Sequence, residues 1–78
     1  MATLRLFATV RVAAGTGRAE FDGGSVGEVL DAAIGTYGAE FESLVPVCRI
    51  WVNGQVADRE TAVGAGDEVA LLPPVSGG

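Results

Sequence analysis

The segment DEVALLPPVSGG, residues 67–78, is the stretch that decides the fold. It contains a short apolar run from Val69 to Leu72, which has the length of a buried or half-buried strand. Pro73 and Pro74 end this strand, because proline has no N–H to donate to a sheet and holds φ near its extended value. The remaining VSGG has almost no side-chain bulk at its end and finishes in a carboxylate. The segment therefore predicts a strand that continues into a stiff, slender tail suited to insertion into a partner.

Length and composition predict one small, soluble domain. The chain has 78 residues, of which 49% are hydrophobic, and this is enough for a core. The single cysteine excludes an internal disulfide, and without histidine the usual zinc sites cannot form. No apolar run approaches the roughly 20 residues of a membrane span, and no basic-then-apolar leader is present. We therefore expect a cytoplasmic protein with no membrane attachment.

The chain is acidic. Ten Asp and Glu residues against five arginines give a net charge of −5 at pH 7. Binding to nucleic acid is therefore not expected, because contact with a phosphate backbone needs a basic surface. The charge fits docking onto basic partners, although most small acidic proteins are acidic for solubility alone.

Two hydrophobic patterns predict the secondary structure. Apolar residues spaced three and four apart predict one helix over residues 26–37, with a capping box of Ser25 and Glu28 at its start and Gly38 at its end. Asn53-Gly54 is a common two-residue hairpin turn. Alternation predicts strands at residues 3–8, 18–22, 48–52, 55–57 and 69–72.

The predicted order of elements is β-β-α-β-β-β, which is an α+β layer with one main helix packed on a mixed sheet of about five strands. We expect a single domain over residues 1–78, with residues 73–78 as an extended tail. The pattern leaves residues 9–14 open between an extension of the first strand and a short helix. Residues 39–44 favour one further helical turn.

Strand alternation leaves one face of the predicted sheet without a cover. On the strands at 3–8, 48–52 and 69–72, every second residue faces the main helix. Large apolar side chains interleaved with arginine on the opposite face favour a protein interface. The alternatives are that loops or residues 9–14 cover these side chains, or that the strand parity is off by one residue. The residues on this face are Arg5, Phe7, Arg49, Trp51 and Leu72.

The side chains form no recognisable catalytic constellation. Cys48 faces the core by alternation, and the chain has no histidine to activate it. The acidic pairs Glu40/Glu42 and Asp67/Glu68 are most simply solvated surface residues. The chain alone is therefore not expected to be an enzyme, and it is not expected to bind a metal or a cofactor.

The order of elements and the end of the chain resemble those of a known family. The small size and the terminal Gly77-Gly78 resemble the ubiquitin-like, β-grasp sulfur carriers. Within them, E-V-A-x-x-P-P-V before the diglycine is similar to the small subunit of molybdopterin synthase. Residues 4–8 (LRLFA), Val10-Arg11 and residues 66–68 (GDE) are also similar to that family. The resemblance implies a β-grasp fold.

The resemblance implies a sulfur carrier whose chemistry takes place at the carboxylate of Gly78. A ubiquitin-activating-type adenylating enzyme would adenylate this carboxylate with MgATP. A sulfur donor such as a cysteine desulfurase or a rhodanese would then supply the sulfur of a thiocarboxylate. The tail would enter the large subunit of molybdopterin synthase and donate sulfur to cyclic pyranopterin monophosphate, in molybdenum cofactor biosynthesis. The chain would be the non-catalytic, sulfur-donor subunit.

The resemblance also implies roles for individual residues. Gly77 and Gly78 would carry the chemistry, since two residues without a Cβ can thread a narrow channel. Partner contacts would come from the uncovered face and the base of the tail, namely Arg5, Phe7, Arg11, Arg49, Trp51, Leu72, Pro73, Pro74 and Val75.

The sequence leaves other functions open. The same carrier chemistry could serve thiamine, cysteine, thiolated tRNA or a sulfur-containing secondary metabolite. The chain could instead be a ubiquitin-like modifier that is joined through Gly78 to lysines of target proteins. It could also be a plain β-grasp interaction domain in which the diglycine has no role.

Overall fold

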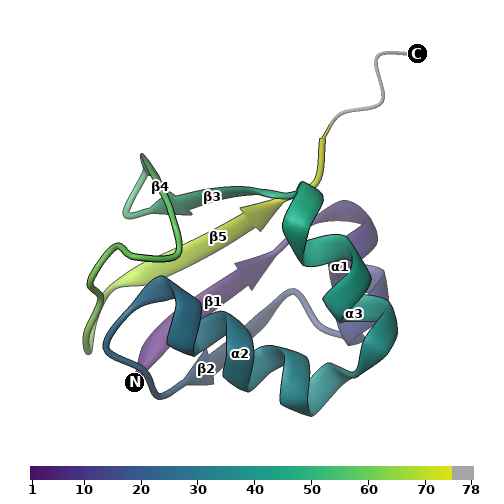
Figure 1. Cartoon of the computed structure of the whole chain (residues 1–78), viewed down its shortest axis with the longest axis horizontal. Helices are drawn as coiled ribbons and strands as arrows, with labels where there is room; N and C mark the ends of the chain where they lie inside the picture. Colours follow the sequence, from purple (N-terminus) through teal and green to yellow (C-terminus); the bar gives the residue numbers. More distant parts are fainter. Residues whose placement is uncertain (75–78) are drawn as a thin grey trace.

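The computed structural model describes residues 1–74, which form a five-stranded mixed sheet with helices packed against it (Figure 1). The strands are β1 (Ala2–Leu6), β2 (Arg18–Phe21), β3 (Arg49–Val52), β4 (Gln55–Ala57) and β5 (Glu68–Leu72). The helices are α1 (Ala8–Ala14), α2 (Val26–Tyr37) and α3 (Ala39–Leu44), and a short 3₁₀ helix, η1 (Val45–Val47), follows α3. The predicted α+β class and the mixed sheet are confirmed.

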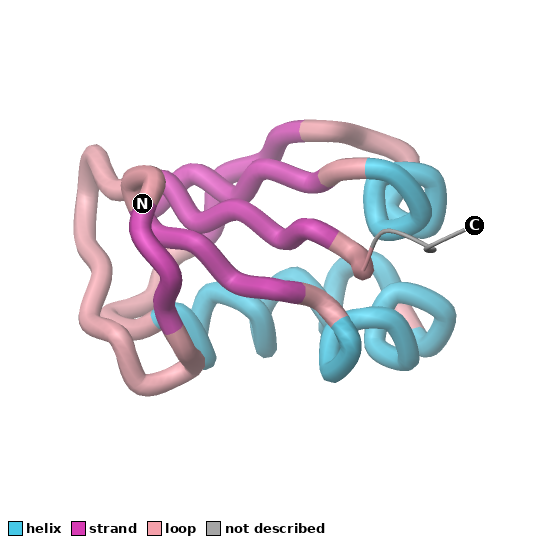
Figure 2. Tube along the Cα trace, turned by 90° about the horizontal axis from the view of Figure 1, so that it is seen from above, coloured by secondary structure: helices cyan, strands magenta, loops and turns pink. Residues whose placement is uncertain are grey.

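Strand β5 lies in the middle of the sheet, whose order is β2-β1-β5-β3-β4. It runs parallel to β1 and antiparallel to β3. Val69 lies opposite Leu4 and Leu71 lies opposite Leu6, and all four side chains are buried. Figure 2 shows the strands as one layer, with the helices along one side of it and at one end. The strand predicted at residues 69–72 is therefore the centre of the fold.

Helix α2 covers the buried face of the sheet, as the sequence predicts. The Ser25 hydroxyl accepts a hydrogen bond from the Glu28 backbone N–H at 3.2 Å, and the Glu28 carboxylate accepts one from the Gly24 N–H at 2.8 Å. This reciprocal pair satisfies donors at the start of the helix. Val29 and Leu30 are buried in the core. Within residues 1–74, no helix is long and apolar enough to cross a membrane.

Residues 9–14, which the sequence left open between strand and helix, belong to α1. The chain leaves β1 by a sharp turn at Ala8, whose φ of 51° lies in the left-handed region. Val10 is buried in the core, and α1 packs against α3 at the end of the sheet where β1 finishes (Figure 1). This segment therefore adds to the helical side of the molecule and does not cover the opposite face. The further helical turn expected at residues 39–44 is confirmed as α3.

The glycines of α2 have different surroundings. A Cβ at Gly27 would lie 3.1 Å from the Arg59 carbonyl oxygen, to which the Gly27 N–H donates a hydrogen bond at 2.8 Å. This glycine therefore lets the loop after β4 approach the helix closely. Gly35 has no atom within 4 Å of the position of a Cβ.

Replacing Gly35 by alanine should stabilise the protein. Gly costs about 1 kcal/mol relative to Ala inside a helix, and the space for a methyl group is open here. We expect the melting temperature of Gly35→Ala to rise by about 4–8 °C, measured by circular dichroism. Gly27→Ala is the matched control and should melt below the wild type, because its Cβ presses on the Arg59 backbone. A Gly27→Ala variant that gains as much as Gly35→Ala would contradict this assignment of the close approach.

Asp67 ties the β3–β4 turn to the start of β5. Its carboxylate accepts hydrogen bonds from the Asn53 side-chain amide at 3.0 Å and from the Gly64 N–H at 2.9 Å. The Asn53 side-chain oxygen in turn accepts the Glu68 N–H at 2.9 Å. The hydrogen bond from Asn53, followed by that from Gly64, lowers the pKa of Asp67 below its ordinary value of 3.8. These bonds fix the position at which the central strand begins.

The lowered pKa of Asp67 makes part of the stability depend on pH. Because the pKa falls on folding, this stabilisation is present above the ordinary pKa and is lost as the pH falls through the folded-state value. We expect Asp67→Asn to melt below the wild type at neutral pH, and the gap between the two melting temperatures to narrow as the pH is lowered through the ordinary carboxyl pKa of 3.8 and below it. A gap that stays constant over this range would show that Asp67 is not the group responsible.

Candidate functional site

The face of the sheet opposite α2 carries side chains that are only partly covered; we call it the open face. Arg5 on β1 lies opposite Ala70 on β5, and Ala70 lies opposite Trp51 on β3. The same row continues to Arg18 on β2 at one edge and to Val56 on β4 at the other. Val56 is 75% exposed, whereas Trp51 and Ala70 are half-buried. The open face is therefore a mixed apolar and basic surface.

A second row of the open face lies at the end from which the chain leaves β5. Leu72 lies opposite Arg49, and Phe7 directly follows Leu6, which is paired with Leu71. Phe7 is 38% exposed, and it lies in extended backbone immediately before the turn at Ala8. Phe7, Leu72 and Arg49, which the sequence predicts on one face, thus lie at the same end of the sheet.

The base of the tail starts from this second row. Pro73 is half-buried and Pro74 is exposed, and both follow Leu72 directly. The sites predicted at Val75, Gly77 and Gly78 lie outside the described residues. The open face and the departure point of the tail are therefore contiguous.

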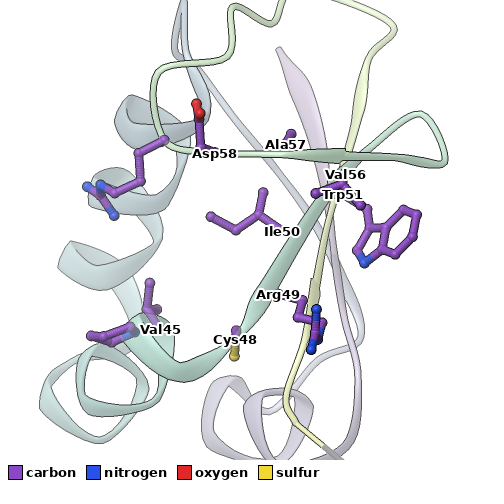
Figure 3. A pocket seen from close by; sticks show the side chains of 10 residues that line it. Val45, Cys48, Arg49, Ile50, Trp51, Val56, Ala57 and Asp58 are labelled. Carbon is purple, nitrogen blue, oxygen red and sulfur yellow. The ribbon is translucent and has the colours of Figure 1, made fainter.

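The close-up of β3 supports the predicted strand parity (Figure 3). Arg49 and Trp51 extend to one side of the strand, and Ile50 extends to the other. Ile50 packs against the core. A hollow of about 440 Å³ lies beside this strand, lined in part by Val45, Ile50 and Ala57.

Cys48 also lines this hollow, and it packs against the core as the sequence predicts. Its thiol donates a hydrogen bond to the Leu44 carbonyl oxygen at 3.2 Å. Burial raises the pKa of the Cys48 thiol. The thiol therefore stays protonated at neutral pH, which is the opposite of what a nucleophilic cysteine needs.

Arg11, predicted as a partner contact, lies on α1, close to the end of β1 and the start of β2. It lines a hollow of about 420 Å³ together with Arg5, Arg18 and Phe7; we call this the arginine hollow. The Arg5 guanidinium lies 5.6 Å from the centroid of the Phe7 ring, within the range of a cation–π contact. The fold therefore places basic groups directly beside the exposed aromatic ring.

Arg18 and Val56 belong to the open face, but sequence reasoning did not select them. A signal was available for each. Alternation over residues 18–22 puts the apolar Ala19 and Phe21 on one face and Arg18 on the other. The Asn53-Gly54 turn pairs Val52 with Gln55 and hence Trp51 with Val56, which puts both of the latter on one face.

Half-exposed aromatic and aliphatic side chains bordered by arginines have the composition of a protein interface. Aromatic and arginine side chains provide the strongest contacts in such interfaces. Here they lie next to the point where the tail begins. The geometry therefore defines a docking surface that could hold a partner while the tail reaches into it.

The chain belongs to the ThiS family of ubiquitin-like small proteins, whose family model matches residues 4–78. A curated relative, small archaeal modifier protein 1 of Haloferax volcanii, is 39% identical, and the match covers 95% of this chain and 97% of the relative. Proteins of this kind are sulfur carriers or modifiers and not catalysts. The predicted ubiquitin-like class is confirmed, and the molybdopterin-specific role remains a prediction.

Solved structures confirm the β-grasp fold. The crystal structure of the Haloferax volcanii protein has a TM-score of 0.82 and 36% identity, and covers 99% of this chain and 98% of its own. The solution structure of small archaeal modifier protein 1 from Methanosarcina acetivorans has a TM-score of 0.89 and 28% identity, with coverages of 99% and 95%. A complex of subunits 1 and 2 of molybdopterin-converting factor from Helicobacter pylori includes a chain with a TM-score of 0.72 and 26% identity, with coverages of 99% and 97%.

Proposed function

We propose that this protein is a sulfur carrier and the small subunit of a molybdopterin synthase, with the carboxylate of Gly78 as its acting group. The observation that carries this proposal is the contiguity of the central strand, the open face and the base of the tail. Leu72 ends β5 on the open face, and Pro73 and Pro74 follow it directly. The family model also extends through residue 78, so the diglycine lies within the family pattern.

The chemistry follows from the reactivity of a carboxylate. A carboxylate is a poor acyl donor, so an adenylating enzyme first converts it to a mixed anhydride with MgATP and releases pyrophosphate. A persulfide from a cysteine desulfurase or a rhodanese attacks the acyl carbon and displaces AMP, which gives an acyl disulfide. A thiol then reduces the acyl disulfide and leaves the thiocarboxylate. The carrier supplies the reacting atom, and its partners supply the catalysis.

The body of the protein makes this transfer efficient by holding the tail. Strand β5 is paired on both sides and its inward residues are buried, so the base of the tail is fixed. Pro73 and Pro74 restrict the backbone at the base of the tail, so less entropy is lost when the tail enters a partner. In the synthase, the tail delivers its sulfur to cyclic pyranopterin monophosphate inside the large subunit. The likeness to a chain of the Helicobacter pylori complex of subunits 1 and 2 of molybdopterin-converting factor supports this client.

A second candidate is conjugation to proteins, which the 39% identity to a small archaeal modifier protein favours. Activation of Gly78 is the same, but a lysine amine of a target protein attacks the acyl carbon and forms an isopeptide bond. The chain itself contains no lysine, so it cannot accept such a bond on its own side chains. The two candidates therefore differ in the nucleophile and share the activated carboxylate.

Intact-mass measurement tests the proposal. The chain is incubated with an adenylating enzyme from the same organism, MgATP and a sulfur donor. We expect a mass gain equal to the replacement of one oxygen by one sulfur, which disappears when MgATP is omitted. Conjugates to lysines without a sulfur-bearing free form would favour the modifier instead. If no adenylating enzyme of the organism produces either product, the carrier proposal is wrong.

The client is tested separately by gene deletion. Loss of molybdoenzyme activity, with thiamine and cysteine synthesis intact, is expected for the molybdopterin client. Loss of thiamine or cysteine synthesis instead would assign the carrier to another pathway of the same chemistry.

A further inference from the structure

Three of the five arginines of this acidic protein line one hollow. Arg5, Arg11 and Arg18 line the arginine hollow, in a chain whose net charge is −5. By contrast, Arg59 is bound to Asp31 on α2 at 2.6 Å. Grouping like charges raises the free energy of the folded chain unless an anion compensates them. The arginine hollow is therefore a candidate binding site for a negatively charged group.

The protein neutralises these arginines poorly by itself. The Arg5 guanidinium is 3.5 Å from the Glu68 carboxylate, and both side chains are well exposed to solvent. Such an exposed ion pair contributes little. Within residues 1–74, Arg11 and Arg18 have no carboxylate within ion-pair distance. The hollow therefore offers guanidinium groups that an external acid can bind.

Hydrogen bonds hold the backbone turn that borders the hollow. The Thr16 hydroxyl donates to the Arg18 carbonyl oxygen at 2.9 Å and accepts the Arg18 N–H at 3.3 Å. The Gly17 carbonyl oxygen accepts the Leu6 N–H at 3.0 Å, which ties the turn to β1. A Cβ at Gly17 would lie 3.2 Å from Arg11 Nε, so the bare glycine lets the Arg11 side chain lie across this turn.

We propose that the arginine hollow binds a carboxylate-bearing segment of the protein that docks on the open face. Guanidinium groups bind carboxylates through paired, charge-assisted hydrogen bonds. The exposed Phe7 ring borders the hollow, so the partner presents an apolar side chain next to its acid. If the proposed function is right, this partner is the enzyme that activates Gly78. The acidic character of the contact is inferred from the arginines alone and does not rest on the proposed function.

An acidic protein segment fits the surroundings of the hollow better than a phosphate polymer does. Trp51, Val56 and Leu72 continue the open face with apolar surface, which a phosphate backbone does not use. Glu20 and Glu68 flank Thr3 in the next row of the face and would repel a long polyanion. The negative net charge by itself fits basic partners, but the grouping of Arg5, Arg11 and Arg18 predicts an acid at this contact.

Arginine side-chain NMR tests the proposal on the full chain. The Nε–Hε signals of the ¹⁵N-labelled protein are followed while a short synthetic peptide of alternating leucine and glutamate is added. We expect the signals of Arg5, Arg11 and Arg18 to shift and that of Arg59 to stay. The same peptide with glutamine in place of glutamate should leave all of them in place. Binding should weaken at least tenfold in the variant R11Q/R18Q and remain unchanged in R59Q.

Each other outcome overturns the proposal. If inorganic phosphate or an oligothymidylate shifts these signals at lower concentration than the peptide does, the hollow is a phosphate site. If the glutamate peptide shifts nothing, or if R59Q weakens binding as much as R11Q/R18Q does, the hollow has no specific role. A chain that lacks Gly77 and Gly78 should bind the peptide as the wild type does, because the hollow lies among residues 5–18. Intact-mass measurement therefore tests the carrier chemistry, and peptide binding tests the arginine hollow independently of it.

Discussion

Deletion of Gly77 and Gly78 should abolish sulfur loading completely and leave the melting temperature of the domain unchanged. The variant ends in Ser76, so its carboxylate falls about 7 Å of extended chain short of the place where it is activated. The buried core lies between Ala2 and Leu71, which the deletion does not touch. Intact-mass measurement after incubation with the adenylating enzyme, MgATP and a sulfur donor gives the first quantity, and circular dichroism gives the second.

Two alanine variants separate the position of the carboxylate from the need for glycine. Gly78→Ala keeps the length of the tail and adds a Cβ that a narrow channel must accommodate, so its loading should be slowed but detectable. Gly64→Ala, in the loop before β5, is the matched control, because open space surrounds its added Cβ. It should load as fast as the wild type. Wild-type loading of the truncated chain would show that the reacting group is elsewhere.

Much of the site could be predicted because successive residues of a strand point to opposite faces of the sheet, and only one of these faces is buried. Leu4, Leu6, Val69 and Leu71 are buried, and Arg5 and Trp51 lie on the opposite face, as the alternation required. A shift of one residue would have reversed both faces, so the pattern fixed the parity of every strand it covered. The capping box at Ser25 was equally local, since its hydrogen bonds join residues three and four apart.

The course of residues 8–14 could not be predicted, because it depends on tertiary contacts. Alanine rarely adopts a left-handed φ, yet Ala8 does so here, at a cost of about 1–2 kcal/mol that the buried Val10 helps to offset. That turn brings Arg11 beside Arg5. The arginine hollow therefore depends on a backbone conformation for which the local sequence carries no signal.

Phe7→Ala should weaken binding to the large synthase subunit and to the adenylating enzyme by tenfold or more, with little change in stability. Truncation of an aromatic hot-spot residue in a docking surface commonly costs about 2 kcal/mol or more in binding. Phe7 is not part of the buried core cluster, so its truncation leaves the core intact. Isothermal titration calorimetry against each partner measures the affinity. Val12→Ala is the matched control, because Val12 is an apolar residue of α1 that is 81% exposed and lies outside the hollow.

The loss of affinity should also depend on distance from the tail. Leu72 directly precedes Pro73, and Phe7 lies at the same end of the sheet. If partners hold the protein in order to position its tail, these two side chains must fit the partner more closely than Val56 on the edge strand β4. Phe7→Ala and Leu72→Ala should therefore weaken binding more than Val56→Ala does, although Val56 exposes the larger fraction of its surface. The opposite ranking would mean that partners dock on the β4 edge. If Phe7→Ala and Val12→Ala bind the partners with equal affinity, the open face is not the docking surface, because removing its exposed aromatic ring then has no more effect than removing an exposed side chain elsewhere.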